Sequence, residues 1–217
     1  MRALIDRLVQ SGLEQPKKLR LKEAVDLEEY CLDTSCVKAN IHFDTDVRVV
    51  VRGKAGADVE FGNTVLVGEN RQGIILDYQL LQDSAPADSA LLMESLMRVW
   101  ERFGRTVGAV AADRGFFSQS NSRTLDESET FNALCPRDPQ QLKKRMKGKR
   151  FASMQRRRSQ TEGRIAILKN GFWGRPMRAK GFEHRELALA WGVLTHNLWM
   201  FARLKKTPKP KALLQAA

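Results

Sequence analysis

The chain has 217 residues and a formal net charge of +12, because 37 Lys and Arg side chains outnumber 25 Asp and Glu. Hydrophobic residues make up 42% of the sequence, which is enough for a core and excludes a chain that is disordered by composition. Three cysteines are too few for a disulfide scaffold. The uncharged stretch Leu187–Ala202 is shorter than the roughly 20 residues of a membrane span, and Asp6 and Arg7 interrupt the place of a secretion signal. We therefore expect a cytoplasmic protein without a membrane partner.

Apolar periodicity predicts mostly strands in the first third of the chain. Residues 1–24 have the pattern of a short amphipathic helix followed by a Lys-rich connector. A strand is expected at Glu29–Val37, and a β-branched run follows at Val47–Val51. Alternating residues in Val59–Val67, a Gly-containing turn at 68–73 and a returning segment at Ile74–Leu81 predict a hairpin.

Helices and strands alternate in the middle of the chain. A helix is predicted from Pro86 to the residue before Gly104. The apolar side chains that share its inward face are Leu92, Leu96, Val99 and Phe103. Three short elements follow, namely a buried strand at Thr106–Ala112, a helix at Ser120–Glu127 and a strand at Thr130–Leu134.

The last third of the chain is predicted to begin with a polar, basic loop at 137–150 and to continue as two helices. The first helix spans Phe151–Phe172, and the second, more apolar one spans Leu187–Leu204. An apolar stripe runs along the second helix, and we expect it to face the core. Its members are Leu187, Trp191, Leu194, Leu198 and Phe201.

The order of these elements predicts an α/β fold. Three strands that pair antiparallel precede strands that alternate with helices, which favours a mixed sheet, antiparallel at first and parallel afterwards, with helices on both faces. We expect residues 1–24 to be a helix and connector, 25–205 to form the main domain with the basic loop 137–150, and 206–217 to be a basic, flexible tail.

The positive charge is concentrated in one segment. Residues 140–180 contain fourteen Lys and Arg side chains but a single acidic one, Glu162. A basic segment on an otherwise near-neutral chain favours a polyanionic partner, most often nucleic acid. The alternative is a basic face that is simply solvated.

Three carboxylates occupy positions that a fold rarely gives to acids. Asp33 interrupts a predicted strand, and Asp113 ends an apolar one, where a buried carboxylate is costly unless it is paired or bound to a metal. On the helix 151–172, Glu162 falls on a polar stripe beside the apolar face, with Arg158 one turn before it and Lys169 two turns after it. Two of these acids also have a simpler explanation. Asp113 could be an ordinary turn residue, and Glu162 could do no more than form a surface ion pair with Arg158.

Taken together, the three acids beside a basic segment suit a hard divalent cation. Mg²⁺ prefers carboxylate and water oxygens and commonly keeps a substrate phosphate as a ligand. Without a cation, clustered carboxylates repel one another and raise each other's pKa. We therefore predict that Asp33, Asp113 and Glu162 bind Mg²⁺, with Mn²⁺ as a substitute.

The sequence around these acids resembles the catalytic domain of DDE transposases from bacterial insertion sequences, which has a ribonuclease-H-like fold. The segments that carry the resemblance are YCLDTSCVKANIHFDTD around Asp33, VEFGNTVLV at 59–67, VAADRGF around Asp113 and RSQTEGRIAILK around Glu162. They occur in the expected order and cover roughly residues 25–205. The chain looks shortened relative to such transposases.

The segment around Glu162 is the most specific of the four. Transposases of this type show a Tyr-x2-Arg-x3-Glu-x6-Lys signature, and Arg158, Glu162 and Lys169 stand at that spacing. Gln155 occupies the position of the tyrosine.

The resemblance implies cleavage of DNA and transfer of the cut strand. Asp33 would bridge two Mg²⁺ ions, while Asp113 and Glu162 would each complete the coordination of one. A water would cut the DNA backbone, and the resulting 3′-OH would attack target DNA at the same site. The implied partner is double-stranded DNA, both transposon ends and target, with the active protein a homo-oligomer. The expected DNA-binding residues are Arg158, Lys169, Lys143, Lys144, Arg145, Lys147, Arg156, Arg157 and Arg164.

Two other functions fit the same residues. One is a metal-dependent nuclease that cuts DNA without joining strands. The other is an inactive remnant of a transposase that still binds DNA. In each case we expect the protein in the bacterial cytoplasm, associated with the nucleoid through DNA.

Overall fold

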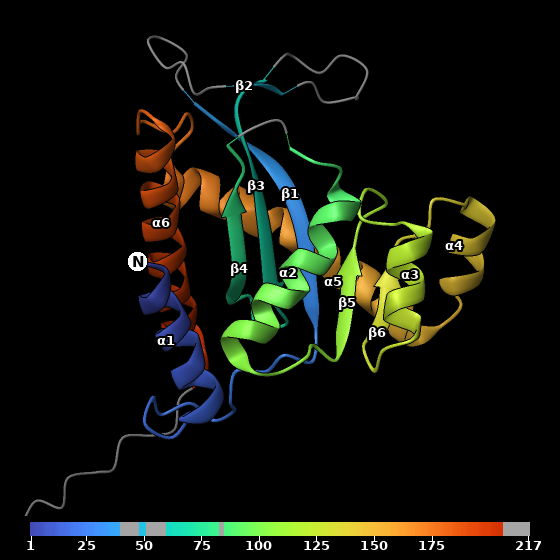
Figure 1. Cartoon of the computed structure of the whole chain (residues 1–217). Helices are drawn as coiled ribbons and strands as arrows, with labels where there is room; N and C mark the ends of the chain where they lie inside the picture. Colours follow the sequence, from blue (N-terminus) through green and yellow to red (C-terminus); the bar gives the residue numbers. More distant parts are fainter. Residues whose placement is uncertain (40–47, 51–59, 83–84, 206–217) are drawn as a thin grey trace, which may run out of the picture.

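The computed structural model describes residues 1–39, 48–50, 60–82 and 85–205, which form one sheet with helices on both faces (Figure 1). The strands are β1 (Tyr30–Lys38), β2 (Arg48–Val50), β3 (Glu60–Asn70), β4 (Ile75–Leu80), β5 (Ala109–Ala112) and β6 (Phe131–Leu134). The α-helices are α1 (Arg2–Glu14), α2 (Asp88–Phe103), α3 (Gln119–Asp126), α4 (Pro139–Arg145), α5 (Lys149–Ile167) and α6 (Phe182–Arg203). A short π-helix, η1 (Leu168–Trp173), continues α5.

The sheet has the mixed topology that the sequence predicts. Strand β3 pairs antiparallel with β1, β2 and β4, so the expected hairpin is β3–β4. Strands β1, β5 and β6 are parallel neighbours in that order. The central part of the run Val47–Val51 forms β2, whereas its two end residues lie outside the described part of the chain. The tail 206–217 also lies outside it.

Apolar side chains pack on both faces of the sheet. On one face α1, α2 and α3 cover a core that includes Tyr30, Leu32 and Val110, and on the other face α5, η1 and α6 cover Val65, Val67 and Ile75. The predicted inward face of α2 is confirmed, since three of its four apolar residues are buried and Leu96 packs against them. No helix of the described residues is both long and apolar enough to cross a membrane.

The basic segment 137–150 is partly helical, which corrects the prediction of a loop. Asp138 caps α4, because its carboxylate accepts hydrogen bonds from the backbone N–H groups of Gln140 and Gln141, at 3.1 and 3.0 Å. Pro139 follows at the first helical position, where its fixed φ and missing N–H cost nothing. The Asp-Pro pair was therefore a helix-start signal within a stretch whose charge alone indicated a loop.

The orientation of α6 also differs from the prediction. The residues Leu187, Trp191 and Leu198 are 49%, 53% and 51% exposed, so most of the predicted inward stripe faces outward. Polar Asn197 faces inward instead, and its side-chain amide exchanges two hydrogen bonds of 2.9 Å with the backbone of Ile75 on β4. This contact extends the pairing of an edge strand, which hydrophobic periodicity cannot reveal.

A close approach of two aromatic-rich segments fixes the same orientation. Trp173 of η1 lies against Gly192 of α6, where a Cβ would come within 2.4 Å of the indole ring. Its Nε1 donates a 3.3 Å hydrogen bond to the carbonyl oxygen of Leu189. Only a glycine at this position lets α6 present this face to η1.

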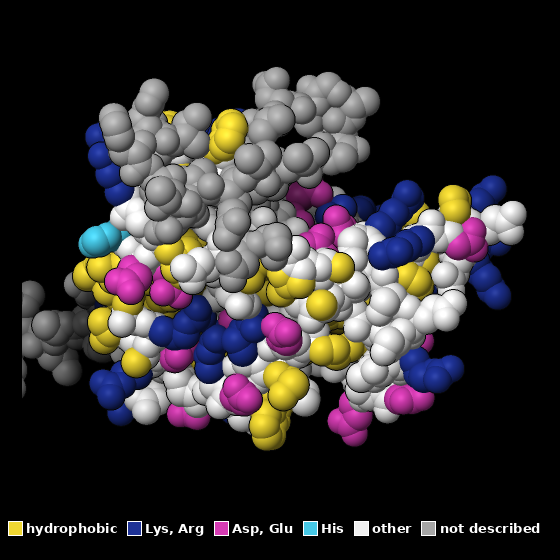
Figure 2. All heavy atoms as spheres, turned by 45° about the horizontal axis from the view of Figure 1, so that its top comes forward, with side chains coloured by type: hydrophobic (Ala, Val, Ile, Leu, Met, Phe, Trp, Pro, Cys, Tyr) yellow, Lys and Arg dark blue, Asp and Glu magenta, His cyan; other side chains and the backbone are white. Residues whose placement is uncertain are grey.

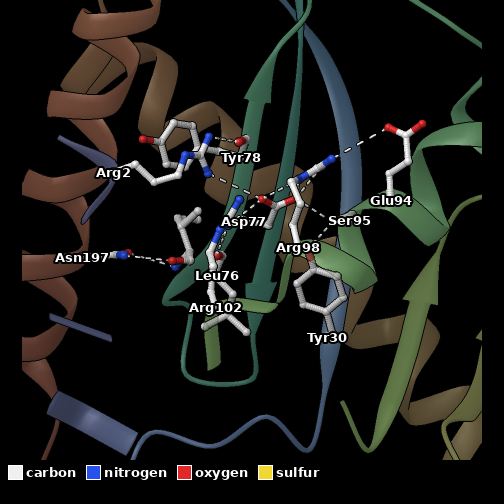
Figure 3. A network of polar contacts seen from close by, with 11 residues as sticks. Arg2, Tyr30, Leu76, Asp77, Tyr78, Glu94, Ser95, Arg98, Arg102 and Asn197 are labelled. Atoms are coloured by element: carbon white, nitrogen blue, oxygen red, sulfur yellow. Dashed lines mark hydrogen bonds and ion pairs between the residues drawn. The ribbon is translucent and has the colours of Figure 1, made fainter. Parts of the chain in front are cut away.

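In the described part of the chain, two carboxylates are completely buried, and both are paired with arginines. Asp77 on β4 accepts a hydrogen bond from Ser95 and forms ion pairs with Arg98 at 2.7 Å and Arg102 at 2.8 Å, as Figure 3 shows. The hydroxyl groups of Ser95 and Tyr30 lie 2.7 Å apart, which joins β1 to the cluster. These contacts attach α2 to the sheet.

The second buried carboxylate attaches α5 to the opposite face. Glu69 on β3 accepts hydrogen bonds from Arg157, Thr161 and Arg164, each at 2.9 Å. These donors are spaced at one-turn intervals along α5 and therefore lie on the same face of the helix. The neighbouring stripe of α5 carries Arg158 and Glu162, and both residues are in electrostatic range of Asp33 on β1.

Candidate active site

Alternation along β1 sends its side chains to two different helices. Odd-numbered residues face α5, since Cys31 packs with Phe151 and Met154, and Ser35 accepts a 2.6 Å hydrogen bond from the Lys169 ammonium group. Asp33 shares this face. Its neighbour Thr34 points to the opposite face and toward α2.

The strand register brings the two aspartates together. In the parallel pair β1–β5, Tyr30 aligns with Val110 and Cys31 with Ala111. Continuing this register by two residues places Asp33 beside Asp113, which directly follows β5. The Asp113 carboxylate accepts a 2.8 Å hydrogen bond from the backbone N–H of Gly115, so the turn after β5 holds it at the end of the strand.

The other two predicted acids both act electrostatically on Asp33. Burial, and then the negative charge of Asp113, raise the pKa of Asp33 from 3.8 to about 7, and Glu162 adds to the rise. The Thr34 N–H and the positive charge of Arg158 act in the opposite direction without cancelling it. Among the described residues, no Lys or Arg forms an ion pair with Asp33. Its negative charge is therefore left largely uncompensated by the protein.

Glu162 and Arg158 lie on α5, and the second predicted basic neighbour, Lys169, lies on η1, which continues that helix. Arg158 donates a 2.9 Å hydrogen bond to Glu162 one turn away, and Lys169 reaches β1 through Ser35. The Glu162 side chain is 60% exposed. An exposed pair at this spacing contributes only about 0.3–0.5 kcal/mol, so the carboxylate can leave Arg158 for a stronger partner at little cost.

A fourth carboxylate, Asp88, belongs to the same place and was missed by the sequence analysis. It is the first residue of α2, and it accepts a 3.0 Å hydrogen bond from the Thr34 hydroxyl group. Its pKa is raised by burial and by the charge of Asp113. The only sequence signal was an acid at a helix start, which is common and needs no site to explain it.

The donors at this edge fit a hard divalent cation in kind. Asp33 is in electrostatic range of Asp113 and Glu162, and Asp88 is in range of Asp113. Carboxylates near one another are ligands that oxygen-seeking ions prefer, and such an ion would offset their repulsion. As they stand, no three Asp, Glu, His or Cys side chains within the described ranges are close enough together to enclose an ion.

The basic residues predicted to bind DNA separate into three groups. Lys143, Lys144, Lys147 and Arg156 are exposed on α4, the α4–α5 connection and α5. On the right of Figure 2, Lys and Arg side chains (dark blue) lie near Asp and Glu side chains (magenta). Arg158 and Lys169 lie at the acidic centre itself.

The third group points into the protein, which corrects the prediction for its members. Arg157 is 9% exposed and, like Arg164, is committed to Glu69. Arg145 is half-buried, stacks on the ring of Phe151 at 4.4 Å and donates to backbone carbonyl groups of β6. The run Arg156–Arg158 thus sends three identical side chains to three different places, as the 100° turn per helical residue requires.

Comparison with protein families decides the assignment. A family model for the transposase DDE domain matches residues 44–198. The chain belongs to this transposase family. The matched range contains Asp113 and Glu162 and begins after Asp33, whose place beside Asp113 comes from the strand register. No curated protein matches the chain.

A solved structure agrees with this membership at the level of the fold. The piggyBac transposase, in a synaptic complex with hairpin DNA, superimposes with a TM-score of 0.52 at 9% identity, over 83% of this chain and 48% of that one. The chain therefore spans about half the length of that transposase. The simian T-cell lymphotropic virus intasome, in complex with PP2A regulatory subunit B56 gamma, gives a TM-score of 0.45 at 12% identity, over 89% and 61% of the two chains. The predicted ribonuclease-H-like fold is confirmed.

Proposed function

We propose that this chain is the catalytic part of a transposase that cuts the backbone of double-stranded DNA and joins the resulting 3′-OH to target DNA. Membership of the transposase DDE family supports the reaction class. The observation that carries the proposal is the coupling of Asp113 and Glu162 to Asp33, which leaves an uncompensated acidic centre beside a basic surface. Such a centre has little use in a protein that only binds DNA, because carboxylates repel phosphates.

Asp33, Asp113 and Glu162 are the residues proposed to hold Mg²⁺, or Mn²⁺ in its place. When bound, a pair of such ions activates a water and stabilises the attacking and leaving oxygens of an in-line displacement. The protein's own part is to orient the phosphodiester. Arg158 on α5 acts on Asp33, and Lys169 on η1 reaches the same face of β1 through Ser35, so both are suited to contact the phosphates that flank the cleaved bond.

The exposed basic residues extend this contact along the DNA. Lys143, Lys144, Lys147 and Arg156 offer a positive surface on the α4 side of the acidic centre. Contacts of this kind bind backbone phosphates without reading sequence. If about six phosphates are neutralised, the logarithm of the binding constant should fall with the logarithm of salt concentration at a slope of roughly −5. We include assembly into a homo-oligomer on paired DNA ends in the proposal.

The test is a nicking and strand-joining assay on labelled duplex DNA with Mg²⁺ or Mn²⁺. Asp33→Asn, Asp113→Asn and Glu162→Gln should each bring product below detection while leaving DNA binding intact. Glu101→Gln is the matched control, since Glu101 is an exposed acid on α2 with no recorded contact in the described structure. Unchanged nicking in any of the three variants would remove that residue from the site.

The same assay distinguishes a transposase from a metal-dependent nuclease and from an inactive DNA-binding protein. Nicked product without joined product, under conditions that supply target DNA, indicates a metal-dependent nuclease and contradicts strand transfer. DNA binding without either product contradicts an enzymatic role for this chain.

A further inference from the structure

Asp88 connects the two segments that carry the proposed catalytic aspartates. Its Oδ1 accepts the 3.0 Å hydrogen bond from the hydroxyl group of Thr34, which is adjacent to Asp33 on β1. Its other oxygen, Oδ2, lies over Gly115, in the turn that holds Asp113. One side chain at the start of α2 therefore contacts the first segment and overlies the second.

The space around Gly115 shows how closely the carboxylates approach. A Cβ at Gly115 would lie 2.6 Å from Oδ2 of Asp88 and 3.1 Å from Oδ1 of Asp113. Both oxygens therefore border the space next to the Cα atom of Gly115, which the Cβ of any other residue would fill. The φ angle of Gly115 is not in the left-handed region, so space rather than backbone conformation requires a glycine here.

The environment of Asp88 is not that of an ordinary structural acid. Within the described structure no Lys or Arg forms an ion pair with it, in contrast to buried Glu69 and Asp77. It does not cap its own helix either, since the N-cap residue is Ala87 and no side chain bonds to the first turn. Its contacts are those to Thr34 and to the Asp113 turn, and both lead to the proposed site.

We propose that Asp88 is a positioning residue of the site, which acts through Thr34 on β1 to hold Asp33 at the distance from Asp113 that metal binding requires. The inference rests on the proposed function and adds a residue to it. Strand β1 is anchored on its other face by Ser35 and Lys169 and is paired with β3, so loss of the tie through Thr34 removes the side-chain contact with α2 next to Asp33. The expected consequence is a looser pair of aspartates within an intact fold.

The test compares variants on both sides of the Thr34–Asp88 hydrogen bond. Asp88→Ala and Thr34→Val should each lower the kcat of nicking about tenfold to a hundredfold and weaken Mn²⁺ binding measured by calorimetry, while KM for DNA stays the same. The double variant should be no worse than either single one, because both remove the same contact. Thr34→Ser keeps the hydroxyl group and should restore both readouts, and Asp88→Asn should lose less than Asp88→Ala.

A further variant moves Asp88 without changing any acid. Gly115→Ala places a methyl group 2.6 Å from Oδ2 of Asp88 and 3.1 Å from Oδ1 of Asp113. It should weaken Mn²⁺ binding in the wild-type background, and it should do so less beside Asp88→Ala, where the closer of the two contacts is gone and only the one with Asp113 remains. Matched controls are Glu101→Gln on α2 and Thr124→Val on α3, both exposed. Thermal unfolding of each metal-free variant reports whether the fold is intact.

The outcomes are distinct from those that test the proposed function. Additive losses in the double variant, failure of Thr34→Ser to restore Mn²⁺ affinity, or equal damage by Asp88→Asn and Asp88→Ala would each overturn the positioning role. If the wild-type chain does not nick DNA, the proposed function fails, whereas the Mn²⁺ affinities still decide the role of Asp88.

Discussion

The fold gives basic partners to the buried acids Glu69 and Asp77 but none to the proposed catalytic acid Asp33, among the residues that the structure describes. Glu69 and Asp77 are 0% exposed, and each is surrounded by arginine and hydroxyl donors from a helix (Figure 3 for Asp77). Asp33 is partly buried, has acids as neighbours and has its pKa raised to about 7. The protein can therefore neutralise a carboxylate inside its core, and at Asp33 it does not.

The paired acids have a structural role, whereas the unpaired acid Asp33 belongs to the proposed site. Glu69 fixes the rotation of α5, and this rotation brings Glu162 and Arg158 to Asp33. Glu69, an acid paired with arginines, thus orients the helix that carries Glu162. On this account, the charge that is missing at Asp33 is supplied by a bound cation.

The largest expected effect comes from breaking a compensated cluster. Arg157→Ala removes one partner of fully buried Glu69 and should lower the free energy of unfolding by about 3–5 kcal/mol. Arg156→Ala, at the exposed neighbouring position, should change it by no more than about 0.5 kcal/mol. Urea unfolding followed by circular dichroism measures both. Equal effects would show that the inward and outward arginines of α5 are not distinguished as described.

The next effect concerns the ion proposed to compensate Asp33. Mg²⁺ or Mn²⁺ at a hundred times its dissociation constant should stabilise the wild-type chain by about 2.7 kcal/mol, because the ion binds the folded state alone. Asp33→Asn should lose most of this gain. Thermal unfolding at constant ionic strength, with Glu101→Gln as control, provides the measurement. A gain of the same size in Asp33→Asn would place the ion elsewhere.

A smaller effect of the opposite sign is expected without metal. Because the pKa of Asp33 is raised from 3.8 to about 7, the folded state holds a proton there that the unfolded state releases. This contribution to stability is present below about pH 4 and is lost as the pH rises to about 7. Asp33→Asn does not titrate, so at pH 8 it should melt a few degrees above the wild type in EDTA, and the difference should shrink toward pH 5. A difference that does not vary with pH would contradict the raised pKa.

The smallest effect distinguishes the outward basic residues from the rest. Arg156→Ala should reduce the magnitude of the salt slope of DNA binding by about 1, the loss of one phosphate contact. Arg105→Ala, an exposed arginine between α2 and β5, should leave the slope unchanged. Fluorescence anisotropy over a range of salt concentrations measures the slope. Equal changes in the two variants would remove α5 from the DNA surface.

The sequence was sufficient for the main strands of the sheet. Apolar runs, alternation and turn residues predicted β1, β3, β4, β5 and β6, and the order of strands and helices along the chain predicted a sheet that is antiparallel at first and parallel afterwards. Asp33 within β1 and Asp113 after β5 could be predicted because a charged residue stands out against an apolar strand. Glu162 could be assigned to the polar stripe of its helix because helical spacing and a specific motif agreed, and its part in a site with Asp33 and Asp113 stays a prediction.

Contacts between distant segments were beyond the reach of the sequence. Which of Arg156, Arg157 and Arg158 faces inward depends on Glu69, a residue of another strand that looks like any other acid. The exposed stripe of α6 and its inward Asn197 depend on the edge of β4 in the same way. Asp88 was missed because its role depends on a hydroxyl group and a glycine from two other elements.

Asp33, Asp113 and Glu162 are proposed to meet around a divalent cation. Fe²⁺ bound in place of Mg²⁺, with ascorbate and peroxide, generates radicals that cut the protein backbone next to the ion. We expect cuts near residues 33, 113 and 162 of the same chain, all suppressed by excess Mg²⁺ and absent in Asp33→Asn. Cuts confined to one of these segments, or unaffected by Mg²⁺, would contradict it.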